Sequence, residues 1–218
     1  MAVLAVFASS AYAADWPVIK KLSESEGVIK FAPIKTAKHR VGFAMAAEQG
    51  EYAFFESTEL RAEIAYDASL EDNVSLFYDH TLARMIEGWS FNGSPSYGAK
   101  GKVVVGYSTF LYQAYTLGNG FACVGFDYQW DEPAAEPDGN PGKIMFGYVC
   151  KKQSGPLDQG QIDTFINGLD PEGAVEASGS LPKPGNASTD PAALQAGKTA
   201  NRFFPFNYGN EFSENPGN

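Results

Sequence analysis

The segments Phe121 to Trp130 (FACVGFDYQW) and Lys143 to Cys150 (KIMFGYVC) decide the fold of this chain. Both are rich in the aromatic and β-branched residues that favour strands. Between them, Asp131 to Gly142 (DEPAAEPDGNPG) holds three prolines and two glycines, so it cannot continue a strand ladder. We therefore expect two antiparallel strands joined by a loop.

The two cysteines of the chain lie on these two strands. If the hairpin is symmetrical about residues 136 and 137, Cys123 lies opposite Cys150, just as Trp130 lies opposite Lys143. Directly opposed residues in a non-hydrogen-bonded pair are about 4.5 Å apart between Cα atoms, which is within disulfide range. The chain has no C-x-x-C motif typical of a redox-active cysteine. The register therefore predicts a structural Cys123–Cys150 disulfide.

The segments on either side extend this hairpin. Lys102 to Tyr115 (KVVVGYSTFLYQAY) predicts a preceding strand, and Gly118-Asn119-Gly120 predicts the turn that follows it. Pro156 to Leu169 predicts a helix that stops at Gly168 and Pro171. Its apolar residues recur at three- and four-residue spacing: Ile162, Phe165, Ile166 and Leu169.

The first half of the chain carries weaker signals. Alternating apolar residues predict strands at residues 41–45 and 60–66, with a turn at Glu48 to Glu51 between them. Leu70, Val74, Phe77, Met85 and Trp89 fit a helical stripe, although residues 74–78 fit a strand equally well. We expect residues 15–170 to form one α+β domain: an antiparallel sheet with a disulfide-linked hairpin, packed by the helix near its C-terminal end.

The N-terminal segment, residues 1–14 (MAVLAVFASSAYAA), predicts export. It is an uncharged apolar run that ends in Ala11-Tyr12-Ala13, the A-x-A pattern of a signal-peptidase site. The run is too short to span a bilayer. A secretory signal normally begins with Lys or Arg, and this one has neither, so we expect the true start to lie upstream. The predicted location of the mature protein is the periplasm or the extracellular space, with no transmembrane segment.

The C-terminal segment, residues 171–218, has a different composition. It contains six Pro, six Gly and six Asn and few aliphatic residues. Such a segment cannot bury enough apolar surface to offset the entropy of ordering it, so we expect an extended or disordered tail. Its exception is an aromatic cluster that either docks on the domain or binds a partner: Phe203, Phe204, Phe206 and Tyr208.

Composition and charge exclude several classes of function. The chain has 218 residues and a net charge of −10, which argues against nucleic acid as a partner because phosphate contacts need Lys and Arg. Two cysteines and two histidines leave few parts for a metal site, and no cofactor is predicted. Charge is uneven, with a local +3 at residues 15–40 and −8 at residues 41–88. Two solvated faces explain this pattern, and a basic end that touches an anionic surface is the alternative.

Catalytic candidates are weak. Asp79-His80 offers a histidine and a carboxylate, but neighbouring residues on a strand point to opposite faces, and no motif marks a nucleophile. Glu48 and Glu56 could form a carboxylate pair, although any chain with 26 acidic residues offers such pairs. The acidic loop at residues 131–142 could hold Ca²⁺ but lacks the EF-hand spacing.

Aromatic residues on the central strands form the candidate binding surface. They occupy alternate positions, so those on one strand share a face. That face is either core beneath the predicted helix or an open platform for a sugar, a peptide or a partner protein. The candidate residues are Tyr107, Phe110, Tyr112, Phe126, Tyr128 and Trp130.

Three hypotheses for function follow from these features. The first is an exported protein that binds a protein or envelope partner, because the chain has an export signal and an aromatic excess but no catalytic motif. The second is an exported hydrolase that uses His80 or a pair of carboxylates. The third is a subunit of a larger extracellular or membrane-associated assembly, with residues 171–218 wrapped around a neighbour. The oligomeric state is not predicted.

Overall fold

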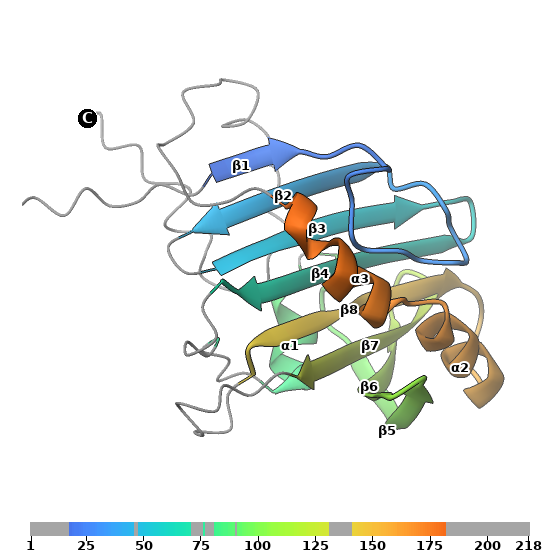
Figure 1. Ribbon diagram of the computed structural model, residues 1–218. Helices are drawn as coiled ribbons and strands as arrows, with labels where there is room; N and C mark the ends of the chain where they lie inside the picture. The colour runs from blue at the N-terminus through green and yellow to red at the C-terminus, as the bar shows by residue number, and fades with distance from the viewer. Residues whose placement is uncertain are drawn as a thin grey trace, which may run out of the picture.

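One antiparallel sheet of eight strands organises the protein. The computed structural model describes residues 18–45, 48–70, 76, 81–89, 91–130 and 141–181. The strands lie in the order β1-β2-β3-β4-β8-β7-β6-β5, so two four-stranded meanders meet where β4 pairs with β8 (Figure 1). The strands are β1 Val18–Lys21, β2 His39–Met45, β3 Glu48–Glu56, β4 Leu60–Ser69, β5 Ser96–Val105, β6 Ser108–Leu117, β7 Phe121–Trp130 and β8 Lys143–Lys152.

The hairpin of β7 and β8 has the predicted register. Cys123 lies opposite Cys150 and Trp130 lies opposite Lys143. The predicted disulfide is present, with 4.0 Å between the two Cα atoms. The prediction succeeded because side chains alternate with a period of two along a strand, so loop symmetry fixes every opposed pair at once.

One face of the sheet is covered by α2, Gln159–Asn167, and by α3, Pro171–Ala177 (Figure 1). Helix α2 confirms the helix predicted at residues 156–169. Its N-terminus carries a capping box, in which Asp158 accepts from the backbone N–H of Gln161 and the Gln161 side chain accepts from the N–H of Asp158. Its buried side chains are those of the predicted stripe: Ile162, Phe165 and Ile166, with Leu169 just beyond the helix.

The opposite face is covered by α1, Leu82–Gly88, which lies behind the sheet in Figure 1. Thr81 caps this helix by accepting from the backbone N–H of Arg84. Met85, Ile86 and Trp89 are buried here against the disulfide-bearing face of the sheet. The two faces therefore have separate apolar cores, as expected when both sides of a sheet carry apolar residues.

An internal ion pair ties the loop after β1 to the first of these faces. Arg40 on β2 contacts Glu51 on β3, and both side chains are buried. Glu51 also accepts the backbone N–H of Val28 at 2.5 Å, and Arg40 donates to the carbonyl oxygen of Ile29 at 3.0 Å. Burial raises the pKa of Glu51, opposed by the charge of Arg40. Arg40 also pairs with the half-exposed Glu24 of this loop at 3.1 Å. These contacts fix the loop, because removing Arg40 would leave the Glu51 carboxylate buried without a counter-charge.

Two predictions for the strands were wrong. Glu48 to Glu51 is not a turn but the start of β3, and Glu51 faces the core because Arg40 neutralises it there. The segment Lys102 to Tyr115 is not one strand, because it turns at Gly106 and Tyr107 between β5 and β6. Gly106 has a φ of 58°, a left-handed conformation that glycine adopts without the steric cost of a side chain.

The first residues of the predicted tail are helical and packed on the domain, which corrects the predicted boundary at residue 171. Residues 171–177 form α3 and residues 178–180 a turn of 3₁₀ helix, and both Ala174 and Leu181 are buried in the core. Asp170 accepts from the backbone N–H of Gly173, and Pro171 occupies the first helical position, where its missing N–H costs nothing. In the described segments, no helix is long and apolar enough to cross a membrane.

Candidate functional site

The catalytic candidates do not form a site in the part of the chain that the structure describes. Asp79 and His80 lie outside the described residues, as does most of the acidic loop at residues 131–142. Glu48 and Glu56 are at opposite ends of β3, about 27 Å apart, so they cannot act on one substrate bond. Within the described ranges, no three His, Cys, Asp or Glu side chains gather as metal ligands would.

Three of the aromatic candidates on the central strands are core rather than an open platform. Tyr112 on β6 lies directly opposite Phe126 on β7, so they share a face as expected. That face is covered by α2, which buries Phe110, Tyr112 and Phe126. The hydroxyl of Tyr112 donates to the side-chain oxygen of Gln159 at 2.9 Å. These three rings are therefore unavailable to a ligand, which corrects their assignment as candidate binding residues.

Tyr128 and Trp130 extend the same aromatic row and are only partly buried. Their rings stack with centroids 4.5 Å apart and planes at 12°. Tyr128 also lies 5.0 Å from the ring of Phe110, and Trp130 lies 6.0 Å from that of Tyr66. Tyr128 and Trp130 therefore pack against the periphery of the hydrophobic core. The aromatic cluster at Phe203, Phe204, Phe206 and Tyr208 lies outside the described residues.

A buried polar cluster on the α1 face centres on Glu63. Its carboxylate accepts from the hydroxyl of Tyr52 at 3.0 Å, from Nη2 of Arg61 at 2.7 Å and from the hydroxyl of Tyr148. Burial, and next the charge of Glu63, raise the pKa of both tyrosines well above its ordinary value. Both hydroxyls therefore stay protonated and act as donors, and the cluster holds together β3, β4 and β8 without supplying a base.

Arg61 closes this cluster toward solvent. Its guanidinium lies 4.6 Å from the ring centroid of Phe54 and 4.1 Å from that of Phe91, so two aromatic rings contact it. It also lies 3.8 Å from the carboxylate of Glu56. Glu63 and Glu56 already compensate the charge of Arg61. The Arg61 guanidinium is therefore a poor binding site for an additional anion.

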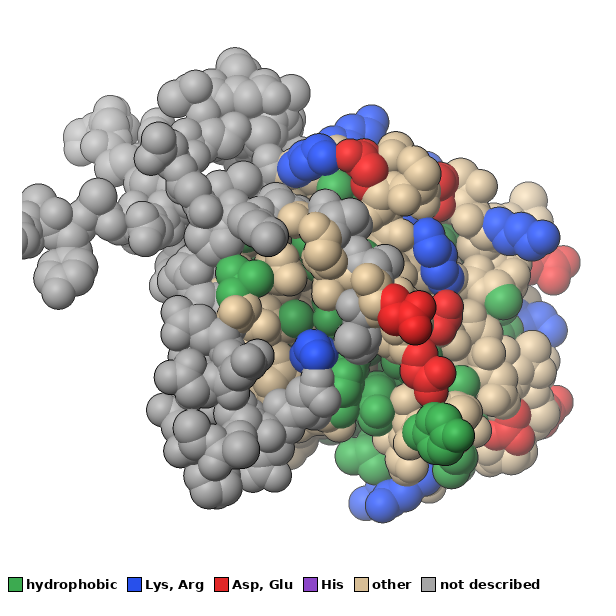
Figure 2. Space-filling model, viewed as in Figure 1, with side chains coloured by type: hydrophobic (Ala, Val, Ile, Leu, Met, Phe, Trp, Pro, Cys, Tyr) green, Lys and Arg blue, Asp and Glu red, His purple; other side chains and the backbone are tan. Residues whose placement is uncertain are grey.

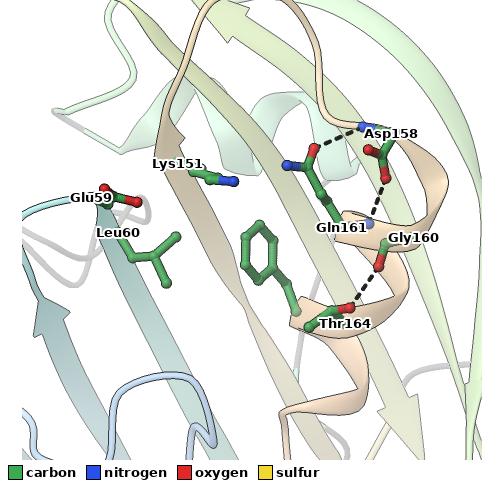
Figure 3. Close-up of a pocket in the computed structure, with 8 residues that line it drawn as sticks. Glu59, Leu60, Lys151, Asp158, Gly160, Gln161 and Thr164 are labelled. Carbon is green, nitrogen blue, oxygen red and sulfur yellow. Dashed lines mark hydrogen bonds between the residues drawn. The ribbon is translucent and has the colours of Figure 1, made fainter.

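A shallow hollow of about 370 Å³ lies between α2 and the adjoining ends of β4 and β8 (Figure 3). Phe165 and Leu60 provide its apolar surface, and Glu59 and Lys151 lie across from the helix. Its remaining polar groups are already engaged in the capping box of α2 and in the bond from Thr164 to the carbonyl oxygen of Gly160. Few groups are therefore left to hold a ligand. The lining residues are Glu59, Leu60, Lys151, Asp158, Gly160, Gln161, Thr164 and Phe165.

Exposed apolar side chains are instead concentrated on the hairpin of β5 and β6. Among the described residues, the only large hydrophobic side chains that are exposed are Tyr97 at 41%, Val104 at 65%, Tyr107 at 98% and Leu111 at 43%. All four belong to this hairpin. We define the hairpin patch as these four residues and the two exposed lysines of β5: Tyr97, Lys100, Lys102, Val104, Tyr107 and Leu111.

The geometry of the hairpin explains this exposure. Tyr107 follows Gly106 at the tip of the two-residue turn, so its ring projects beyond the sheet. Lys102 on β5 lies opposite Leu111 on β6. Both side chains are on the same face of the sheet as α1, but α1 does not extend over this hairpin. Tyr97 anchors the other end, where its hydroxyl donates to the carbonyl oxygen of Ala83 at 3.1 Å. Figure 2 views the molecule from the α2 and α3 side, where acidic as well as hydrophobic side chains lie near the β5–β6 end.

Sequence reasoning found one of the six patch residues, Tyr107. Val104 and Leu111 belong to an apolar run that is typical of a buried strand, so no local signal marks them as exposed. Both side chains are exposed because they lie on the face of the hairpin that α1 leaves uncovered at this end. Comparisons of the chain with protein-family models, with curated proteins and with solved structures find no match.

Proposed function

We propose that this protein is exported and acts by binding another macromolecule through the hairpin patch. The observation that carries the proposal is the concentration of exposed apolar side chains on one hairpin. Scattered single apolar residues are normal on a protein surface, whereas a contiguous group commonly marks an interaction site. Aromatic residues such as Tyr97 and Tyr107 are also enriched in the centres of protein interfaces.

Export is supported by two independent features. The apolar run that ends at Ala11-Tyr12-Ala13 has the pattern of a cleaved signal, and the Cys123–Cys150 disulfide belongs to oxidising compartments. Sequencing the N-terminus of the protein recovered outside the cytoplasm tests this part of the proposal. We expect a new N-terminus within a residue or two of Asp15, and a cytoplasmic protein with an intact N-terminus would contradict it.

Photo-crosslinking tests the binding surface. A benzophenone amino acid replaces Tyr107 at the tip of the patch, and in a matched control it replaces Asn119 at the exposed turn between β6 and β7. Irradiation in the producing cells should give an adduct of one defined mass from position 107 and none from position 119. The same result at both positions, or no adduct at either, would show that the hairpin patch is not the binding surface.

Charge reversal provides the second arm of the test. In the crosslinking variant at position 107, Lys100→Glu with Lys102→Glu should abolish the adduct. The control pair Lys35→Glu with Lys152→Glu makes the same change in net charge at exposed lysines outside the patch, and it should leave the adduct intact. Equal loss in both pairs would indicate a general effect of charge rather than recognition by the patch.

A further inference from the structure

Strand β5 is an open edge of the sheet. It has ten residues and a single neighbour, β6, among the described strands. Half of the backbone N–H and C=O groups of such a strand point away from the sheet and can pair with another chain. The pairing with β6 is irregular between Tyr97 and Lys100, and it is regular from Lys100 to Val105. Those six residues therefore form a usable template.

The other edge of the sheet differs in length. β1 has only four residues, and it ends in Lys20 and Lys21. Short, charged edge strands are a common protection against pairing with other chains. The side chains of β5 are mostly exposed; among the described residues, α2 packs against this strand on the face that holds the buried Val103. Among the described strands, β5 is therefore the longer of the two edges, with ten residues against four in β1.

Two lysines give this edge its charge preference. Lys100 and Lys102 are both exposed, and neither has an ion pair or hydrogen bond within the described structure. They point to the same face of the sheet, about 7 Å apart along the strand. In a chain of net charge −10, two adjacent unpaired cations next to Val104 and Leu111 favour a partner that is both acidic and apolar.

The same lysines disfavour a second copy of this chain as the partner. Antiparallel pairing of two β5 strands about Gly101 would set Lys100 of each copy opposite Lys102 of the other. Like charges directly opposite each other destabilise a strand pair, and two chains of net charge −10 also repel each other. An anionic lipid surface would attract the lysines but would leave the outward backbone groups of β5 without a strand to pair with.

We infer that the hairpin patch binds an extended acidic segment of a partner polypeptide, which adds to β5 as a further strand along Lys100–Val105. The inference rests on the proposed function of the patch. Side chains alternate along an added strand, so every second residue of the segment faces Lys100, Lys102 and Val104. That face of the segment should carry two acidic residues and one apolar residue. On its other face, beside Gly101 and the buried Val103, the segment should carry small residues.

A display library of random octapeptides tests the inference without knowledge of the natural partner. The wild-type protein should enrich peptides that have acidic residues two positions apart and no proline. The Lys100→Glu, Lys102→Glu variant should lose this enrichment and select basic residues at the same spacing. The Lys35→Glu, Lys152→Glu control should enrich the same peptides as wild type. No enrichment over the patch variant, or enrichment without acidic residues, would overturn the inference.

A synthetic copy of the best enriched peptide then separates strand addition from simple charge attraction. Methylating alternate backbone nitrogens removes the donors of one strand edge and keeps every charge, so it should weaken binding by about tenfold or more. Hydrogen exchange of the outward amides of Lys100–Val105 should slow when the unmethylated peptide is bound. Equal binding of both peptides, or unchanged exchange, would overturn strand addition.

Two controls identify the other possible occupants. Binding to vesicles of phosphatidylglycerol in phosphatidylcholine that the patch variant loses, with no peptide enrichment, would assign the patch to a lipid surface. Self-association in sedimentation experiments that Val104→Arg abolishes would assign it to a second copy. Either result overturns the inference. If Tyr107 still crosslinks while the peptides fail, the proposed function survives and only the acidic segment is wrong; if both fail, the proposed function fails as well.

Discussion

Replacing Asp127 with Asn should make the protein more stable at neutral pH. Asp127 lies on β7 and is only 6% exposed. One carboxyl oxygen accepts from Nε2 of Gln129 at 2.8 Å, and the other has no hydrogen-bond partner. Burial raises the pKa of this carboxyl from 3.8 to about 6, and the bond from Gln129 only partly opposes it. The charged form is therefore poorly accommodated, and the neutral amide has nearly the same shape.

The size of the effect follows from linkage between protonation and folding. The pKa is higher in the folded state than in the unfolded state, so folding favours the protonated carboxyl. The stabilising contribution is complete below about pH 4 and is lost as the pH rises through about 6. A shift of roughly 2 units corresponds to at most about 3 kcal/mol. Wild type should lose up to this amount between about pH 4 and about pH 7.5, and Asp127→Asn should not lose this component.

Urea unfolding at these two pH values measures the difference. We expect Asp127→Asn to exceed wild type by about 2–3 kcal/mol at the higher pH and to match it closely at the lower one. Glu59→Gln, which neutralises an exposed carboxylate, serves as the control and should change little at either pH. A difference between wild type and Asp127→Asn that is the same at both pH values would refute the reasoning, because it could not arise from titration of Asp127.

Three further predictions concern the stability of the fold. Replacing Cys123 and Cys150 with Ala should lower the free energy of unfolding by about 3–4 kcal/mol, since the disulfide closes a loop of 27 residues, and reductant should then have no further effect on thermal unfolding. Glu51→Gln should lower the free energy of unfolding in urea by about 1.5–3 kcal/mol, because Arg40 loses its buried counter-charge and keeps only the half-exposed Glu24; a cost below about 1 kcal/mol would mean that the pair contributes little. Gly147→Ala should prevent the native pairing of β8 with β4, because a Cβ atom would overlap a backbone carbonyl of β4, and a native circular dichroism spectrum with unchanged thermal stability would contradict this.

The central hairpin could be predicted from sequence because its determinants are local. The Pro- and Gly-rich loop marks both strand ends, and the period of two fixes the opposition of Cys123 and Cys150. The start of α3 was also predictable. Asp170-Pro171 is an N-cap followed by proline at the first helical position, although Pro171 also has the appearance of a stop for the helix before it.

Other elements depend on contacts that a local pattern does not contain. In the sequence, Glu51 is typical of a turn or of the surface. Its burial depends on Arg40, which is eleven positions earlier in the chain and contacts Glu51 from the neighbouring strand. The burial of Phe110 and the exposure of Val104 are equally invisible in the sequence, because both are apolar residues of predicted strands. Their difference arises because α2 covers the face of the hairpin that holds Phe110, whereas Val104 points to the other face, which the described elements leave open at this end. Phe110 was therefore predicted as a binding residue and is buried in the core, whereas Val104 was predicted in an ordinary strand and belongs to the candidate site.

The number of charged residues in a segment does not show how many of them are available to a partner. The segment of residues 15–40 is the most basic part of the chain, and it was the natural candidate for contact with an anionic surface. Within the described structure, four of its six cations are already engaged: Lys20 with Glu26, Lys30 with two backbone carbonyls, Lys38 with Glu56, and Arg40 with Glu51.

The patch on β5 has fewer cations, but Lys100 and Lys102 have no internal partner and lie beside exposed apolar side chains. A cation that already has a partner must give it up before it can bind another anion, whereas these two lysines lose only water. The availability of a charge, rather than the local density of charge, therefore favours β5 over the basic N-terminal segment as the place where an acidic partner binds.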